Sequence, residues 1–306
     1  MKYINTFSAD VAVSQVALGC MRISNMTPQQ VEHYISNALD HGYNYFDHAD
    51  IYGGNGLCEE IFGKALTLNK SLRDRMVLQT KCAIRPGMYD FSKEHILNAV
   101  DGSLKRLGVE KIDVLLLHRP DILMEPEEVA EAFELLESSG KVSHFGVSNH
   151  NAMQIQLLQK YVKQPLKINQ MQLSITNATM LSSGANVNLT NDDGVNRDGY
   201  LRDYCRLNDI TIQPWSPLQY GFISGAFLSN EKYHDLHMKI NELAEKYGVS
   251  DSGIAIAWLL RLPDRLQPIV GSTNEQRIND IAKAADIVLT RREWYDIYLA
   301  AGYQLP

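Results

Sequence analysis

The chain has 306 residues, of which 45% are hydrophobic, and its formal net charge is −7 at pH 7. This length and hydrophobic content allow a large buried core, and we expect one α/β domain over residues 1–306. The acidic balance argues against a nucleic acid or an anionic membrane surface as partner, because both select for clustered Lys and Arg.

The N-terminus and the cysteines indicate the cellular context. The first residues, MKYINTFSADVAVSQVALG, lack an apolar core of signal-peptide length, and no stretch of the sequence approaches the roughly 18 apolar residues of a membrane span. The cysteines form no CxxC pair, so neither a zinc ribbon nor a disulfide framework is indicated. We therefore predict a cytoplasmic protein with reduced thiols and, without a recognisable association surface, a monomer.

Short apolar runs rich in β-branched or aromatic residues alternate with segments of helical periodicity along the chain. The expected strands are 13–19, 43–48, 76–81, 111–118, 142–149, 166–174, 210–216 and 266–272. The expected helices include 27–41, 92–107, 126–139, 151–163, 231–247 and 250–262. Start signals support two of the helices, since Thr27-Pro28 and Ser92 are favourable N-terminal residues.

Eight strand and helix units predict either a closed barrel or an open, doubly wound sheet. No G-x-G-x-x-G turn follows the first expected strand, and polar residues follow many strands rather than one switch point. The pattern therefore favours a (β/α)8 TIM barrel. We also expect an N-terminal extension strand and an extra C-terminal helix over 291–302, which could cover one rim of the barrel.

The segment 174–199 interrupts this alternation. It is polar and longer than the loops that compact domains usually leave without structure. Two interpretations stay open, namely a mobile surface excursion and a loop that flanks the mouth of a substrate site.

Four polar side chains follow the second, third and fourth expected strands: Asp47, Tyr52, Lys81 and His118. Parallel α/β barrels assemble their active sites at this end of the strands. Reduction of a carbonyl group delivers negative charge to oxygen, so the reaction needs a proton donor and fixed dipoles there. The four side chains suit that reaction without a metal.

Each member of this set has a predicted role. Tyr52 is the proton donor, and the ammonium group of Lys81 is expected to lower its pKa. Asp47 is expected to keep a buried Lys81 charged. His118 is expected to donate a hydrogen bond to the carbonyl oxygen of the substrate.

Other interpretations must be weighed. A lone Tyr or a lone Asp–Lys pair is usually structural, and only the joint placement favours catalysis. His48 and Asp50 could also start a metal site with His118, but such a barrel would need further ligands on later strands. The last three expected strands end instead in Gln172, Leu173, Trp215, Ser216 and Gly271. We expect no metal and place His48, with Tyr52 and His118, in the substrate site.

Longer motifs carry a family resemblance. FDHADIYGG at 46–54 resembles the F-D-T-A-x-x-Y-G signature of the aldo-keto reductases, and LKRLGVEKIDVLLLHRPD at 104–121 resembles their second motif. GVSN, NQMQLS and WSPL resemble later motifs, and the resemblance extends from LGCM at 18–21 to GST at 271–273. It implies a catalytic tetrad of Asp47, Tyr52, Lys81 and His118, and NADPH-dependent reduction of a small-molecule carbonyl substrate to an alcohol.

The resemblance also implies an extended cofactor across the C-terminal face of the barrel. Ser148, Asn149 and Gln170 match positions that bind the nicotinamide carboxamide, and Trp215 matches the aromatic residue that stacks on the ring. The loop 216–225 is expected to present N–H groups to the pyrophosphate, and Arg277 to bind the 2′-phosphate. The remaining expected cofactor contacts are Gly19, Met21, Asp47, Ser216, Leu218, Gly221, Gly225, Gly271, Ser272 and Thr273.

The sequence also departs from the family pattern. Gly271 stands where many members have a phosphate-binding Lys, residues 279–281 lack the usual Glu-Asn adenine pair, and His48 replaces a Thr. Arg277 still favours NADP(H) over NAD(H). The expected substrate pocket comprises Cys20, Met21, His48, Ile51 and the segments 85–90 and 174–199. An NADP(H)-binding regulatory protein with little turnover is the alternative.

Overall fold

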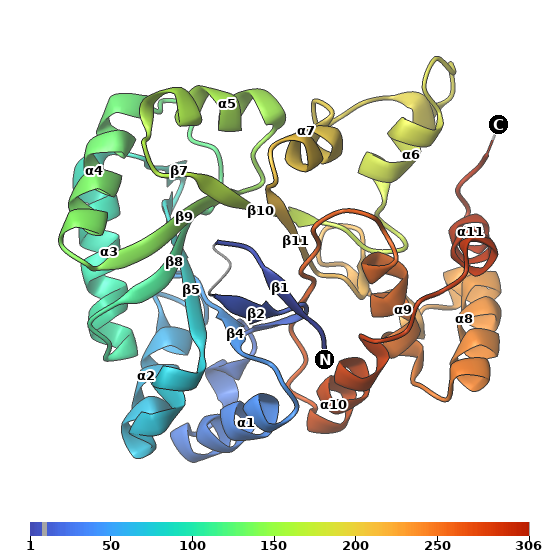
Figure 1. Ribbon diagram of the computed structural model, residues 1–306, viewed down its shortest axis with the longest axis horizontal. Coiled ribbons are helices and arrows are strands. Elements are labelled where there is room, and N and C mark those ends of the chain that lie inside the picture. Colours follow the sequence, from blue (N-terminus) through green and yellow to red (C-terminus); the bar gives the residue numbers. More distant parts are fainter. Residues whose placement is uncertain (8–10, 306) are drawn as a thin grey trace.

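The computed structural model describes residues 1–7 and 11–305. Within these residues, eight parallel strands form a nearly closed (β/α)8 barrel with helices between them (Figure 1), which confirms the predicted fold class. The barrel strands are β3 (Ala17–Gly19), β4 (Tyr45–Asp47), β5 (Val77–Cys82), β8 (Ile112–Leu117), β9 (Val142–Ser148), β10 (Leu166–Gln172), β11 (Thr211–Trp215) and β14 (Ile269–Val270).

The sheet runs in the order β11-β10-β9-β8-β5-β4-β3-β14, and its two ends meet across a short contact. There, Ile212 forms an isolated parallel bridge with Leu266. The N–H of Ile212 donates to Arg265 O (2.9 Å), and the N–H of Gln267 donates to Ile212 O (3.1 Å). These bonds close the ring between β11 and β14.

Helices surround the strands and begin near the predicted start signals. They are α1 (Pro28–Asp40), α2 (Leu57–Leu68), α3 (Lys93–Leu107), α4 (Pro126–Ser138), α5 (Ala152–Tyr161), α6 (Thr179–Ala185), α7 (Leu201–Leu207), α8 (His234–Tyr247), α9 (Asp251–Leu260), α10 (Glu275–Ala284) and α11 (Arg291–Ala300). Thr27 caps α1 in a reciprocal capping box with Gln30, and the Ser92 side chain accepts from His95 N at the start of α3.

The N-terminal extension strand is present, but the first barrel strand is shorter than predicted. β1 (Tyr3–Asn5) pairs with β2 (Ala12–Ser14) in an antiparallel hairpin. The expected strand 13–19 is therefore divided, and only Ala17–Gly19 enters the barrel. The Ser14 hydroxyl donates to Val16 O (2.8 Å), and the Gln15 N–H donates to Lys2 O (2.8 Å), so the chain turns between the two halves.

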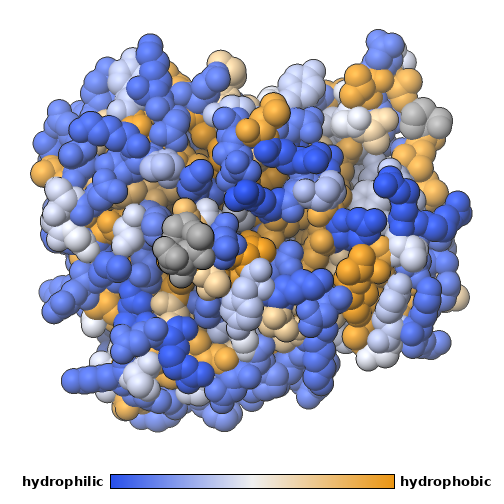
Figure 2. Space-filling view, in the orientation of Figure 1, coloured by the Kyte–Doolittle hydropathy of each residue, from blue (hydrophilic) through white to orange (hydrophobic). Residues whose placement is uncertain are grey.

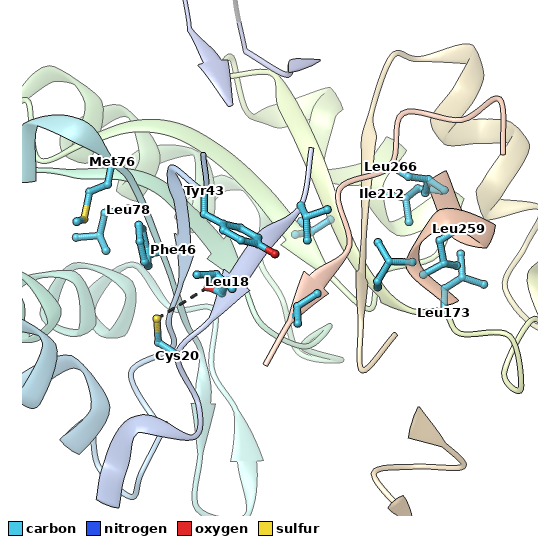
Figure 3. Packing of buried hydrophobic residues seen from close by; sticks show 14 of the residues in the cluster. Leu18, Cys20, Tyr43, Phe46, Met76, Leu78, Leu173, Ile212, Leu259 and Leu266 are labelled. Carbon is cyan, nitrogen blue, oxygen red and sulfur yellow. Dashed lines mark hydrogen bonds between the residues drawn. The ribbon is translucent and has the colours of Figure 1, made fainter. Parts of the chain in front are cut away.

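Two hydrophobic layers hold the barrel together, because successive side chains of a strand point to opposite faces. The inner layer lies beside the hairpin, which crosses the ring of strands in Figure 1; it consists of Val13, Ala17, Tyr45, Val114, Leu116, Ile168 and Ile269. The outer layer packs strands against helices. In it, Leu18, Phe46 and Leu78 lie at paired positions of β3, β4 and β5 (Figure 3).

The segment 174–199 is folded rather than without structure. Its helix α6 buries Met180 and Leu181 in the hydrophobic core. Just before α6, the N–H of Ala178 donates to the Tyr303 hydroxyl (2.7 Å), which connects the segment to the C-terminal end of the chain.

The extra C-terminal helix is present and packs on the outside of the barrel. The Trp294 indole of α11 stacks on that of Trp258 in α9, with ring centroids 4.8 Å apart. Each indole N–H donates to the main-chain oxygen of the other residue, at 3.0 and 3.1 Å. α11 also contacts α8, so it extends the outer layer of helices.

The face that carries the hairpin is largely hydrophilic, with hydrophobic residues in separate patches (Figure 2). None of the helices in the described ranges has the length and apolar character needed to cross a membrane.

Helices α2 and α3 approach each other most closely at Gly63. A Cβ at this position would lie 2.7 Å from the carbonyl carbon of Leu107 and would also clash with the carbonyl oxygen of Arg106. Gly184 in α6 has no neighbouring atom within 4 Å of such a Cβ.

We expect Gly63→Ala to lower the free energy of unfolding by about 1–3 kcal/mol, because two backbones must separate. The control, Gly184→Ala, should be neutral or stabilise by up to about 1 kcal/mol, since Ala is the better helix former. Urea denaturation of both variants measures the difference. Equal effects would show that the helix contact is not tight at Gly63.

Candidate active site

A cavity of about 1100 Å³ lies at the C-terminal ends of the barrel strands. Residues at or following each of the eight strands line it, among them Gly19, Asp47, Tyr89, His118, Ser148, Gln170, Trp215 and Gly271. This is the end at which parallel barrels place their functional side chains. All four predicted catalytic residues lie here, with Asp47, Tyr52 and His118 at the cavity and Lys81 buried beside them.

Lys81 connects the predicted catalytic residues Asp47 and Tyr52. Its side chain is fully buried, and its Nζ donates to an Asp47 carboxylate oxygen (2.8 Å), the Tyr52 hydroxyl (3.0 Å) and the main-chain oxygen of His48 (2.6 Å). All the N–H groups of the ammonium are thus paired. Burial acts to lower the pKa of Lys81, but Asp47 and Tyr52 outweigh it and raise this pKa above its ordinary value. Lys81 is therefore charged at neutral pH.

Tyr52 differs from expectation in its acidity. Burial raises its pKa above the ordinary value of 10.0 and, with Asp47, outweighs the opposing effect of Lys81. Lys81 does lower the pKa of Tyr52, as predicted, but desolvation of the phenolate is the larger effect and the net change is upward. The phenol consequently keeps its proton at neutral pH while it remains hydrogen-bonded to an ammonium group.

His118 approaches Tyr52 edge-on. The ring centroids are 6.1 Å apart and the planes cross at 83°. Burial, then Lys81 and Arg119, hold the pKa of His118 well below its ordinary value of 6.5. Its Nδ1 has no hydrogen-bond partner within the described residues. The imidazole is therefore neutral and carries one N–H that can be donated.

A chain of buried glutamines holds Asp47, and of these the sequence interpretation had singled out only Gln170, for a different role. Gln79 and Gln170 donate to Asp47 Oδ1 at 2.6 and 3.1 Å, and both also donate to Gln213 Oε1. Gln213 in turn donates to Gln267 Oε1 (2.8 Å). These amides lie on four strands or strand ends, with side chains at most 3% exposed. The available signal was the presence of Gln residues within β5, β10 and β11 and just before β14.

The residues predicted to bind nicotinamide also bond to one another. Asn149 has a φ of 60°, and its Nδ2 donates to His118 O (3.2 Å) and to Ser148 Oγ (2.8 Å). Its Oδ1 accepts from Trp215 Nε1 at 3.1 Å. Asn149 thereby connects the ends of β8, β9 and β11, and fixes the indole beside the catalytic group.

The loop 216–225 places different residues at the cavity from those predicted. Ser216 and Leu218 line it, whereas Gly221 and Gly225 do not. The loop forms a small antiparallel pair, β12 (Gln219–Tyr220) with β13 (Gly225–Ala226), and the two glycines adopt φ values of 54° and 143° in its turn. Phe222 and Ile223 line the cavity between them.

Arg22 was the other functional candidate that the sequence interpretation missed. Its Nη1 donates to Gly271 O at 2.8 Å, and a Cβ added to Gly271 would lie 2.8 Å from that same nitrogen. The guanidinium group of Arg22, which follows the first barrel strand, thus occupies the space that a side chain at Gly271 would need. Arg22 lines the cavity with Ser272, Thr273 and Arg277. Its position directly after LGCM was the signal in the sequence.

Some predicted pocket residues lie elsewhere. His48 and Cys20 are fully buried, and neither they nor the segment 174–199 line the cavity as far as the described residues show. The His48 ring packs edge-on against Phe62, and burial lowers its pKa to about 3. This placement does not fit a substrate contact by His48. Among residues 1–7 and 11–305, no three His, Cys, Asp or Glu side chains gather as metal ligands.

Comparison with known proteins gives a consistent picture. The sequence model of the Aldo/keto reductase family matches residues 15–299. The chain is 36% identical to the uncharacterized oxidoreductase YcsN of Bacillus subtilis, over 97% of each protein, and 34% identical to a 6-dehydroglucose reductase of Novosphingobium aromaticivorans, over 97% of this chain and 94% of the relative. An aldo/keto reductase from Klebsiella pneumoniae, solved with NADP and acetate, superimposes with a TM-score of 0.77 at 25% identity, over 100% of this chain and 97% of that one.

Asp50 is a partly buried carboxyl group close to the predicted catalytic residues. Burial and the nearby Glu59 raise its pKa to about 7, and its Oδ1 has no partner within the described part of the chain. The fully buried Glu59 accepts hydrogen bonds from Thr80 (2.5 Å) and Arg106 (2.8 Å).

A raised pKa in the folded state means that folding favours protonated Asp50. Its stabilising contribution is complete below the unfolded pKa of about 4 and is lost as the pH rises towards 7. We expect Asp50→Asn to be more stable than the parent at pH 8, on the order of 1–3 kcal/mol, with a smaller gain at pH 5. Chemical denaturation at both pH values tests this; a pH-independent difference would contradict it.

Proposed function

Because the chain belongs to the aldo/keto reductase family, we propose that it reduces aldehydes or ketones to alcohols with NADPH, with Tyr52 as the general acid. The observation that carries this proposal is the 3.0 Å contact between Lys81 Nζ and the Tyr52 hydroxyl, beside a neutral His118. A phenol held against an ammonium group is a proton donor whose conjugate base is stabilised where it forms. The relatives named as oxidoreductases support the same class of reaction.

NADP(H) suits the donor groups of the cavity. Arg22 and Arg277 bring two guanidinium groups next to Ser272 and Thr273, and such side chains bind phosphate well. Gly19, which also lines the cavity, lets β3 pack closely on β14, since a Cβ there would lie 2.9 Å from Ile269 Cγ2. The Klebsiella pneumoniae relative was solved with NADP. When bound, NADPH supplies the hydride, and Ser148, Asn149, Gln170, Trp215, Arg22 and Arg277 would hold it.

The side chains of the protein then donate the proton and stabilise the charge. Tyr52 and His118 both donate to the carbonyl oxygen of the substrate, and Tyr52 transfers its proton as negative charge develops there. Lys81 stabilises the phenolate that remains, and Asp47 maintains the charge of Lys81. Because His118 is neutral, it donates a hydrogen bond without delivering its own proton.

Replacing the proton donor tests the mechanism. We expect Tyr52→Phe to lower the rate of aldehyde reduction by about 10²–10⁴-fold, because it removes an interaction of the transition state. Affinity for NADPH, measured by quenching of protein fluorescence, should change little. A mild loss of rate would remove Tyr52 as the acid. A parent protein that binds NADPH but reduces no aldehyde in a broad panel would indicate an NADP(H)-binding regulatory protein.

Variants of Arg277 and Arg22 should distinguish the site of the 2′-phosphate from that of the pyrophosphate. Arg277 lies just after the start of α10, where we place the 2′-phosphate. Arg277→Ala should therefore weaken the binding of NADPH by on the order of 1.5–3 kcal/mol and the binding of NADH much less. Arg22 extends from the end of β3 to Gly271, between the catalytic group and Arg277, where we place the pyrophosphate.

Arg22→Ala should therefore weaken the binding of NADPH and of NADH to similar extents. Titration of both cofactors against both variants measures the four affinities. If Arg277→Ala weakened the two cofactors equally, the assignment of the 2′-phosphate to Arg277 would be wrong.

A further inference from the structure

Arg119 is a cation in the catalytic part of the cavity that neither the predicted tetrad nor the cofactor contacts use. It directly follows His118 at the end of β8, and both residues line the cavity. Its guanidinium carbon lies 5.9 Å from the ring centroid of Trp215 and 5.8 Å from that of Phe222. These rings stand perpendicular to each other, 6.0 Å apart. Arg119 is thus held between two aromatic side chains.

The charge of Arg119 has no counter-ion in the described part of the chain. No carboxylate oxygen there comes within 4.0 Å of its guanidinium group, and no hydrogen bond from the group to the protein is present. The carboxylates that line the cavity are Asp47 and Asp251. Asp47 is paired with Lys81, and Asp251 accepts from the N–H of Ser252 at the start of α9. The planar donor edge of Arg119 is therefore available to an oxyanion.

Apolar and aromatic residues line part of the same cavity. They include Ile51 and Ile84, as well as Tyr89, Phe222 and Ile223. Such walls fit a hydrocarbon or aromatic skeleton. Because Arg119 and His118 are consecutive, a carbonyl group at His118 and an anionic group at Arg119 can belong to one small molecule.

We propose that Arg119 binds a carboxylate of the substrate, so that this chain prefers aldehydes or ketones that carry an acidic group on an apolar or aromatic skeleton. The inference rests on the proposed function and adds a substrate class to it. The carbonyl end is held by Tyr52 and His118, and the carboxylate accepts two parallel N–H bonds from Arg119.

A matched pair of substrates tests this assignment. The acid 4-carboxybenzaldehyde and its methyl ester have the same carbonyl group and ring, but only the acid carries a charge. With NADPH, we expect the parent protein to favour the acid in kcat/KM. Arg119→Leu should reduce the ratio of kcat/KM for acid over ester by at least about tenfold, mainly through KM, and Arg119→Lys should restore part of it.

Arg75→Leu is the control variant. Arg75 is not among the residues that line the cavity and is already paired with Asp40 at 3.2 Å, so its removal changes the net charge equally without affecting an available cation. The acid-to-ester ratio should stay at the parent value in this variant. An equal drop in both variants would indicate a general effect of charge and would overturn the assignment to Arg119.

A binding measurement does not depend on turnover. The product 4-(hydroxymethyl)benzoate should bind at least about tenfold more weakly to Arg119→Leu than to the parent, as measured by calorimetry. If the ratio and this affinity are unchanged in Arg119→Leu while the parent reduces both aldehydes, the substrate assignment fails and the reductase proposal stands. If the parent reduces neither compound nor any other aldehyde, the reductase proposal itself fails.

Discussion

The buried ammonium group of Lys81 is the constraint on which the catalytic group depends. A charge can be kept away from water only if its donors are paired, and three acceptors from the β4 side of the barrel pair them. The sheet makes this possible, because Asp47 of β4 stands opposite Gln79 of β5. Lys81 is two residues further on and faces the same interior side. The contact between Asp47 and Lys81 is therefore a consequence of the register between two neighbouring strands.

The interior of the barrel changes character along its axis. Near the hairpin it is filled with hydrophobic side chains, whereas towards the cavity it contains Asp47 and the glutamine chain. The amides of Gln79, Gln213 and Gln267 each both donate and accept, and the chain ends where Gln267 donates to Ser14 O at 2.7 Å. A connected network of this kind holds a carboxylate in one orientation. The same glutamines thus orient Asp47 and connect strands that are distant in the sequence.

Local sequence signals predicted the helix starts, the alternation of strands and helices, and the positions of the four catalytic residues at strand ends. The residues that the sequence interpretation did not identify are held by contacts between distant parts of the chain. Arg22 reaches Gly271, 249 residues away, and Gln79 reaches Gln213, 134 residues away. No local periodicity encodes such pairs. The net acidity of Tyr52 was misjudged for a related reason, since the sequence shows that Lys81 is near but not how strongly burial of the phenol opposes its effect.

The short contact between β11 and β14 has a consequence for stability. The barrel is closed there by one bridge and its main-chain bonds, while the central strands pair over longer ranges. Trp215 at the end of β11 and Gly271 after β14 lie on either side of this seam, and both line the cavity. A dinucleotide bound across them, as we propose, would hold the two sides of the seam together. Occupancy of the cavity and resistance of the barrel to local opening at this seam would then be thermodynamically linked.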